Sequence, residues 1–219
     1  CPGVGSRAAR KAIELAGIGG ADIDLIGVGT TTPDKVFPST ACIVQRKLDI
    51  HGFPAFDVQA VCSGFVYALD IANRMVVTGG ATTALVIGSE TLSRIVNWED
   101  RGTAVLFGDG AGAVILQASD KPGIISTHIH ADGAFEDLLD VPQGISSGYD
   151  ELRTGKAYIQ MQGNAVFRKA VGTLGSMAQE TLDGNGVDKH DLDWLVPHQA
   201  NLRIIAAAAK KLDLSMDKV

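Results

Sequence analysis

The chain has 219 residues, of which 46% are hydrophobic and 20% are charged, and its net charge is −6 at pH 7. This composition predicts a globular protein with a buried core and excludes a mainly disordered chain. The acidic balance disfavours a nucleic-acid binder, and no apolar run reaches the ~18 residues that a membrane-spanning helix needs. Three widely spaced cysteines without a CxxC pair argue against a disulfide framework or a structural zinc site and favour a reducing, cytoplasmic compartment.

Helical and strand patterns alternate along the chain, which predicts an α/β architecture. The glycine-rich stretch Gly144–Gly155 is the best candidate for a surface loop. In chain order we predict a helix at Ser6–Ala16, a strand at Ile23–Thr30, a helix at Pro38–Leu48, a strand at Ala55–Val61, a helix at Ser63–Val77, strands at Thr83–Ser89, Val105–Phe107, Ala113–Leu116 and Ile124–His130, a helix at Asn164–Leu182, a strand at Leu192–Val196 and a helix at Leu202–Leu212.

A weak internal repeat relates a segment near the start of the chain to one near its end. A helix end, a glycine turn and a strand of the form Asp-apolar-Asp-apolar-apolar occur at Ile13–Ile26 and again at Leu182–Leu195. Either a duplicated α/β unit or a chance similarity of two amphipathic segments explains the pattern. If the unit is duplicated, we expect each half to supply part of a shared site.

Cys62 is the first candidate for chemistry, because it lies between a predicted strand and a predicted helix. A thiol there meets the unpaired N–H groups and the positive end of the helix dipole, which favour the nucleophilic thiolate. The alternative is a small buried hydrophobic residue, which is the better interpretation for Cys42 in mid-helix.

His198 is the second candidate. It follows the predicted strand Leu192–Val196, and Pro197 stiffens the turn at the expected carboxyl edge of a sheet, where ligand and catalytic groups collect. Its imidazole can act as acid, base or hydrogen-bond donor near neutral pH, or it can simply cap a turn. Asn201 has the same two interpretations, as a ligand contact or as the N-cap of the next helix.

Other motifs favour structural roles. His128 and His130 would share one face of a strand, but no third ligand is nearby in sequence, so we expect no metal site. The run Gly108–Ala113 resembles a dinucleotide fingerprint with the wrong spacing, and we interpret it as a tight turn between two strands. Basic residues at Arg168, Lys169, Arg203, Lys210 and Lys211 suggest an anionic partner or an ordinary solvated surface.

Several segments together resemble the β-ketoacyl-(acyl-carrier-protein) synthase III family, which initiates type II fatty-acid synthesis. The resemblance runs the whole length, and its most specific part is VPHQAN after Asp-Trp-Leu, with a cysteine far upstream. The segments are Phe37-Pro38-Ser39, Asp57–Leu69, Asp100–Thr103, Phe107–Ala113, Gly123–Gly133, Gly163-Asn164 and Asp193–Ile205.

The resemblance implies a thiolase-like fold, a duplicated α/β unit in five layers α-β-α-β-α, in a homodimer. Residues 1–162 then form most of the N-terminal half, with the nucleophile and an inserted loop region, and residues 163–219 begin the C-terminal half. Because the chain lacks an initiator methionine, and because the family's third triad member, an Asn, lies beyond Val219, we expect a fragment that is incomplete at both termini and inactive alone.

The resemblance also implies the chemistry. An acyl-CoA, commonly acetyl-CoA, acylates Cys62, and His198 assists decarboxylation of malonyl-acyl carrier protein, whose enolate attacks the Cys62 thioester. No cofactor is implied. The residues implied for CoA and pantetheine are Arg101, Gly163, Asn164, Phe167 and Asn201; those near the acyl group are Phe37 (reaching the partner's pocket), Phe107 and Met161; and those for the carrier protein are Gln199, Ala200, Asn201, Leu202 and Arg203, with the basic residues Arg168, Lys210 and Lys211.

Three alternatives remain at this point. A related condensing enzyme could use another primer and make quinolone-like or polyketide-like products. A non-catalytic relative could bind CoA or carrier protein without reacting. The separation of Cys62 and His198 also fits a papain-like cysteine protease, although the sequence expected around its cysteine is absent.

Overall fold

The computed structural model describes residues 1–154 and 157–219, which divide into two compact units. The first unit comprises Cys1–Ser93 and Gly108–Ile124, and the second comprises Arg94–Phe107 and the described part of Ile125–Val219. These units do not test the predicted halves at 1–162 and 163–219, which stay a prediction. Among the described residues, no helix combines the length and the apolar character needed to cross a membrane.

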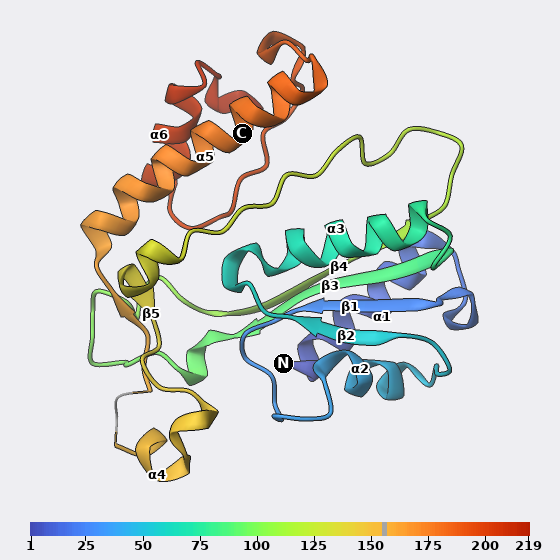
Figure 1. Ribbon diagram of the computed structural model, residues 1–219, viewed down its shortest axis with the longest axis horizontal. Coiled ribbons are helices and arrows are strands. Elements are labelled where there is room, and N and C mark those ends of the chain that lie inside the picture. Colours follow the sequence, from blue (N-terminus) through green and yellow to red (C-terminus); the bar gives the residue numbers. More distant parts are fainter. Residues whose placement is uncertain (155–156) are drawn as a thin grey trace. The chain divides into compact units, whose positions relative to one another are not determined.

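A four-stranded sheet forms the centre of the first unit, in the order β2-β1-β3-β4 (Figure 1). The strands are β1 (Leu25–Gly29), β2 (Ala55–Val58), β3 (Thr83–Thr91) and β4 (Asp109–Gln117). β1 runs parallel to both β2 and β3, and β4 runs antiparallel to β3. The carboxyl ends of β1, β2 and β3 therefore meet at one edge of the sheet, where sites in α/β proteins commonly lie.

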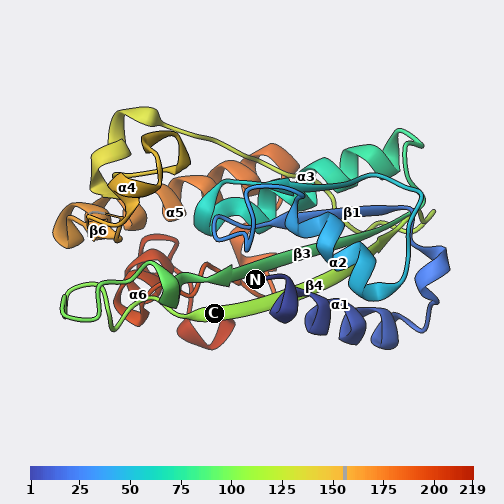
Figure 2. The same ribbon diagram turned by 90° about the horizontal axis from the view of Figure 1, so that it is seen from below.

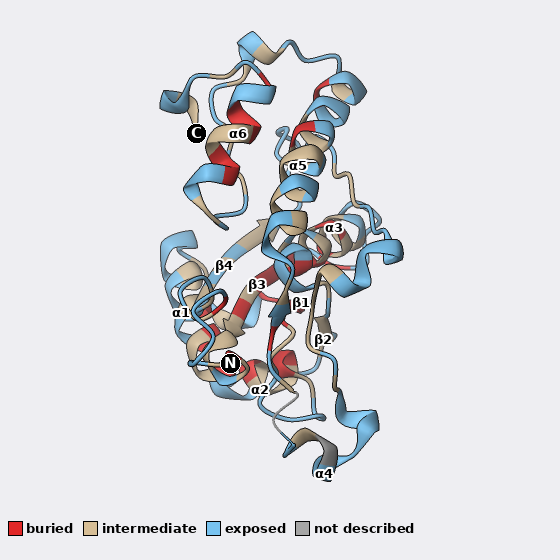
Figure 3. Ribbon diagram, turned by 90° about the vertical axis from the view of Figure 1, so that its left-hand side faces the viewer, coloured by how far each residue is buried: buried red, intermediate tan, exposed pale blue. Residues whose placement is uncertain are grey.

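Helices cover both faces of this sheet (Figures 1 and 3). On one face α1 (Pro2–Ala16) and α2 (Thr40–Leu48) pack through Ala9 and Val44 onto Ile26 and Leu85. On the other face α3 (Gly64–Val77) packs through Ala68 and Ala72. Because both faces are covered, every residue of β1 is buried.

The second unit contains α5 (Gly163–Asn185) packed against α6 (Leu202–Lys211). α6 buries a face of Ile204, Ile205, Ala208 and Ala209 at helical spacing. The remaining elements are the short helix α4 (Tyr149–Leu152) and the two-residue strands β5 (Leu139–Asp140) and β6 (Gln160–Met161), which pair antiparallel.

The internal repeat is visible in the local backbone. α1 ends at Gly17 and α5 ends at Gly186, and both glycines have left-handed φ angles, 67° and 62°. The next residue along donates its N–H back to Ile13 O in the first copy and to Leu182 O in the second. A 3₁₀ turn follows at the same offset, at Gly20–Asp22 and Lys189–Asp191. The repeat therefore extends through the turn, but only the first copy continues into a strand.

Several predicted strands are wrong. Residues 105–107 and 124–130 contain no strand, and Gly110 and Gly112 of the run 108–113 lie within β4 rather than in a turn. Residues 192–196 form no ladder; instead Leu195 N–H donates to Lys218 O at 2.8 Å, and Lys218 Nζ donates to Leu192 O at 2.6 Å. A strand needs a pairing partner as well as an apolar pattern, and β3 supplies one for β4. Figure 2 shows β4 beside α1.

Two further predictions need correction. The second helix begins at Thr40 rather than Pro38, because Ser39 is its N-cap and accepts a hydrogen bond from Cys42 N–H at 3.2 Å. The predicted loop at 144–155 contains a 3₁₀ turn and α4, and its last residue, Gly155, lies outside the described residues.

Candidate active site

Cys62 lies in a 3₁₀ turn, Val61–Ser63, between the end of β2 and the start of α3. Two glycines allow α3 to begin directly over the end of β1. A Cβ added at Gly29 would meet the Gly64 carbonyl carbon at 2.5 Å and Phe65 N at 2.7 Å. This close approach of the two backbones places the thiol at the carboxyl edge of the sheet.

The turn that carries Cys62 is strained. Val61 has φ 46°, in the left-handed region that a β-branched residue rarely occupies. Such conformations cost about 1–3 kcal/mol and persist only where surrounding contacts hold them. Because strained backbone clusters at active sites, this turn supports a functional role for Cys62.

The electrostatics of Cys62 differ from the sequence-based expectation. The side chain is exposed, yet partial burial of the thiol by neighbouring protein raises its pKa. A hydrogen bond with its own backbone amide lowers the pKa, and the Glu90 carboxylate raises it further. The resting residue is therefore favoured as a thiol, and the expected thiolate does not dominate.

His198 lies in the extended segment before α6, and it is exposed. Partial burial lowers the pKa of its imidazole, so the neutral form persists below the usual histidine range. A neutral ring carries one N–H donor and one acceptor, as the predicted role requires. Cys62 belongs to the first unit and His198 to the second.

The second unit brings together several residues implied for CoA and carrier protein. Gly163 and Asn164 open α5, and the Arg203 guanidinium lies 5.8 Å from the centre of the Phe167 ring. Asn201 accepts a hydrogen bond from Arg203 N–H at 2.8 Å, so its side chain is the N-cap of α6. The two interpretations of Asn201 were open, and the structure shows the capping role.

Arg101 lies on a tight loop of the second unit. Asp100 accepts hydrogen bonds from Gly102 N–H at 2.9 Å and from Thr103 Oγ1 at 2.6 Å. The Thr103 and Gly102 hydrogen bonds lower the pKa of the Asp100 carboxyl. Thr103 is buried and Arg101 is exposed, so the loop presents the guanidinium outward from a fixed base.

The residues implied for the acyl group are distributed over the chain. Phe107 and Met161 are half-buried in the second unit, and Met161 lies in β6. Phe37 of the first unit is 82% exposed. Such exposure of an aromatic ring is compatible with a role at an interface, which the sequence resemblance implied.

The residues implied for carrier-protein contact differ in whether their side chains are already hydrogen-bonded within the protein. Gln199, Ala200, Leu202, Arg203, Arg168 and Lys210 are exposed. Gln199 Nε2 donates to Pro197 O at 3.1 Å, and Lys211 Nζ donates to Gly172 O at 3.2 Å. Lys211 is therefore tied to α5, and the most available cations are Arg168, Arg203 and Lys210.

His128 and His130 meet at a carboxylate. His128 Nδ1 and His130 Nε2 each lie 3.0 Å from Glu180 Oε1, on α5. Hydrogen bonds to His130 and His128 lower the pKa of Glu180. Within residues 1–154 and 157–219, no three His, Cys, Asp or Glu side chains are arranged to hold a metal ion.

Two residues of the site, Val61 and Glu90, were not predicted from the sequence. The strain at Val61 carries no sequence signal, since valine disfavours positive φ. Glu90 ends a buried strand beside the threonine run 30–32, but its partners are about sixty residues away along the chain. Only the parallel pairing of β1 with β3 brings them together.

The comparisons with known proteins identify the family. Residues 56–133 match the family model for 3-oxoacyl-(acyl-carrier-protein) synthase III, and residues 182–219 match the model for the C-terminal part of the same enzyme. The chain is 54% identical over 220 residues to the beta-ketoacyl-(acyl-carrier-protein) synthase III of Alkalilimnicola ehrlichii, covering 100% of this chain and 68% of that protein. The chain belongs to this family.

Other matches agree. The synthase III of Thioalkalivibrio sulfidiphilus is 64% identical over 213 residues, covering 97% of this chain and 66% of the relative. A crystal structure of 3-oxoacyl-(acyl-carrier-protein) synthase III from Aquifex aeolicus matches with TM-score 0.91 and 43% identity, covering 98% of this chain and 66% of that one. The thiolase-like α/β fold is thereby confirmed, and the chain spans about two thirds of the length of these relatives.

Proposed function

We propose that the protein is an acyltransferase that initiates fatty-acid synthesis by decarboxylative condensation. The observation that carries this proposal is the exposed Cys62 thiol on a strained turn at the start of α3. Membership of the synthase III family gives that thiol its reaction class.

The first half-reaction transfers an acyl group to Cys62. The sulfur attacks the thioester carbonyl of an acyl-CoA, commonly acetyl-CoA, and CoA leaves as the free thiol. The N-cap of α3, Ser63, makes no side-chain capping hydrogen bond, so the first N–H groups of the helix are free of that partner. N–H groups at such a position stabilise the developing oxyanion.

The second half-reaction forms the carbon–carbon bond. Malonyl-acyl carrier protein loses carbon dioxide, and the resulting enolate attacks the Cys62 thioester. The products are 3-oxoacyl-acyl carrier protein and free Cys62. A neutral His198 that donates one hydrogen bond to the malonyl thioester oxygen lowers the energy of the enolate.

Binding of the substrates falls to the second unit. Arg101, Gly163, Asn164, Phe167 and Asn201 are proposed to line the path of CoA and the pantetheine arm. The exposed cations Arg168, Arg203 and Lys210 suit an acidic carrier protein and the CoA phosphates. Phe107 and Met161 are proposed to contact the acyl group.

The proposed assembly is a homodimer, and the proposed compartment is the cytoplasm. β4 is the last strand of its sheet among the described residues, and an open strand edge suits pairing with another chain. All three cysteines are free, which suits a reducing compartment.

The intact mass of the full-length protein before and after incubation with acetyl-CoA tests the proposal. We expect one acetyl adduct, lost in Cys62→Ala and kept in Cys42→Ala, since the Cys42 thiol is tied to Ala55 O at 3.6 Å. An adduct with a longer acyl-CoA but not with acetyl-CoA would assign a different primer. No adduct with any acyl-CoA would overturn the proposal in favour of a non-catalytic relative.

A further inference from the structure

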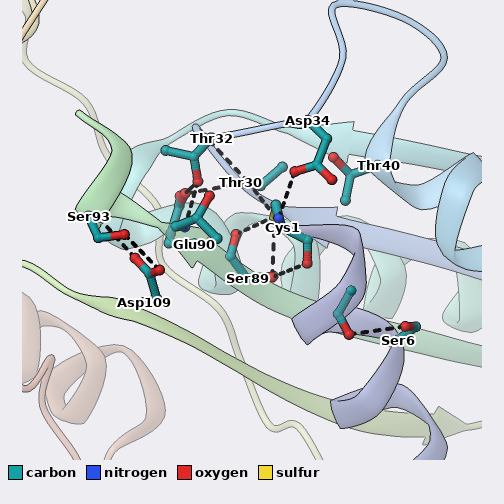
Figure 4. Close-up of polar contacts among 12 residues, drawn as sticks. Cys1, Ser6, Thr30, Thr32, Asp34, Thr40, Ser89, Glu90, Ser93 and Asp109 are labelled. Atoms are coloured by element: carbon teal, nitrogen blue, oxygen red, sulfur yellow. Dashed lines mark hydrogen bonds and ion pairs between the residues drawn. The ribbon is translucent and has the colours of Figure 1, made fainter.

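A threonine segment after β1 is fastened to the end of β3 by one carboxylate. Glu90 accepts hydrogen bonds from Thr31 N–H at 2.7 Å, from Thr30 Oγ1 at 3.4 Å and from the Thr32 hydroxyl. Thr91 N–H completes the junction by donating to Thr32 Oγ1 at 2.8 Å. Figure 4 shows the Glu90 carboxylate beside Thr30 and Thr32.

The same segment is tied to the chain that leads into the Cys62 turn. Thr30 N–H donates to Val58 O at 3.1 Å, at the end of β2. Gln59 Nε2 donates to Thr31 Oγ1 at 3.0 Å. Gln59 lies three residues before Cys62 and two before the strained Val61. Hydrogen bonds therefore run from Glu90 through Thr31 to Gln59, and the backbone continues from Gln59 into the turn.

We propose that Glu90 is a positioning residue for Cys62: its carboxylate holds the Thr30–Thr32 segment, and through Thr31 and Gln59 this segment holds the turn that carries the thiol. The strained φ of Val61 is the reason that such a support is needed, because an unsupported turn relaxes toward an ordinary backbone conformation. The role of Glu90 in catalysis rests on the proposed function of Cys62.

The charge of Glu90 gives the proposal a second and separable consequence. The carboxylate is close enough to Cys62 to raise the pKa of its thiol. Glu90→Gln keeps the size and one acceptor oxygen but removes the charge. A residue that only supports the backbone at a distance from Cys62 has no effect on the pKa of its thiol. The titration of Cys62 therefore shows whether the charge of Glu90 acts on the thiol.

The test is alkylation of Cys62 by iodoacetamide as a function of pH, measured on the full-length protein by peptide mass mapping. In Glu90→Gln we expect the reaction profile to move to lower pH, with about threefold faster alkylation near neutrality because the thiolate fraction rises. Glu14→Gln is the matched control, since Glu14 is exposed on α1 and forms a surface ion pair with Lys11 at 3.1 Å. An unchanged profile together with acetylation of Cys62 by acetyl-CoA at the parent rate in Glu90→Gln overturns the proposal.

A second variant tests the path itself. Thr31→Val removes the oxygen that accepts from Gln59 but leaves the Thr31 N–H for Glu90. We expect acetylation of Cys62 by acetyl-CoA to slow about tenfold, with the alkylation profile unmoved, because the thiol is misplaced and its charge environment is intact. In the double variant, Glu90→Gln with Thr31→Val, acetylation of Cys62 should be no slower than in the slower of the two single variants, since both changes weaken one path.

The outcomes separate the two proposals. Acetylation at the parent rate in Thr31→Val, or additive losses in the double variant, contradicts the path from Glu90 to Cys62. A parent protein that is never acetylated contradicts the proposed function, while the alkylation profiles still decide whether Glu90 acts on the thiol.

Discussion

At Cys62 two opposing effects act on one thiol. Burial and the Glu90 carboxylate raise its pKa, whereas its own backbone amide lowers it. A raised pKa means that the thiol is mostly protonated at neutral pH, so nucleophilic attack needs a proton acceptor or the approach of an acyl-CoA. The proposed nucleophile is thus less reactive toward electrophiles at neutral pH than a thiol with an ordinary pKa, since the thiolate is the reactive form.

At His198 the expected consequence concerns the second half-reaction. His198→Ala should slow condensation by about 100-fold or more while Cys62 is still acetylated, because the proposed role of the histidine is to stabilise the enolate and not the acyl transfer. The measurement is acetyl adduct formation by mass together with carbon dioxide release from malonyl-acyl carrier protein. His190→Ala, an exposed histidine of the same unit, is the control.

The sign of the pH dependence follows from burial of His198. Its pKa is lowered, so the imidazole stays neutral as pH falls through ~6.5 and becomes charged only below that value. The loss of the His198-dependent rate on acidification should therefore be centred below ~6.5. A loss of that rate centred at or above the ordinary histidine value would contradict the lowered pKa.

At the scale of elements, the contact between β1 and α3 positions the site. A Cβ at Gly29 would lie 2.5 Å from the Gly64 backbone, so Gly29→Ala forces α3 and the Cys62 turn away from the sheet. We expect the free energy of unfolding to fall by about 1–3 kcal/mol. Acetylation of Cys62 should slow in the same variant.

Gly112→Ala is the matched control for that change. Gly112 also lies in a strand of this sheet, β4, but a Cβ there meets no atom within 4 Å. Its free energy of unfolding should stay within about 0.5 kcal/mol of the parent value in urea titrations. Equal decreases in the free energy of unfolding in the two variants would mean that the close contact of Gly29 with the Gly64 backbone does not specifically stabilise the fold.

The sequence predicted the elements whose signals are local. The helix ends at Gly17 and Gly186, the position of Cys62 between β2 and α3, and the buried strand β3 all follow from short patterns. β4 was predicted only in part, at Ala113–Leu116, because the glycines before it suggest a turn, and pairing with β3 extends the strand back to Asp109. The interaction of Glu90 with Thr31 has no local signal, since parallel pairing of β1 and β3 creates it.

At the scale of the whole molecule, the proposed homodimer gives Phe37 its role. A ring that is 82% exposed buries little surface within its own unit, whereas an aromatic side chain that enters a partner's acyl pocket would limit the length of the primer. A bulky residue there favours short acyl groups, because longer chains clash with the ring. The preference for acetyl-CoA would then depend on assembly.

Phe37→Ala should therefore widen the range of primers. We expect the ratio of kcat/KM for a longer acyl-CoA to that for acetyl-CoA to rise about tenfold, which corresponds to removal of a modest steric clash. Val36→Ala is the control, since Val36 is the adjacent residue and is 56% exposed. Light scattering on both variants must show the parent mass, so that a change in selectivity is not a loss of the dimer. An unchanged ratio in a dimeric Phe37→Ala protein would remove Phe37 from the acyl pocket and leave primer length to residues of the same protomer, such as Phe107 and Met161.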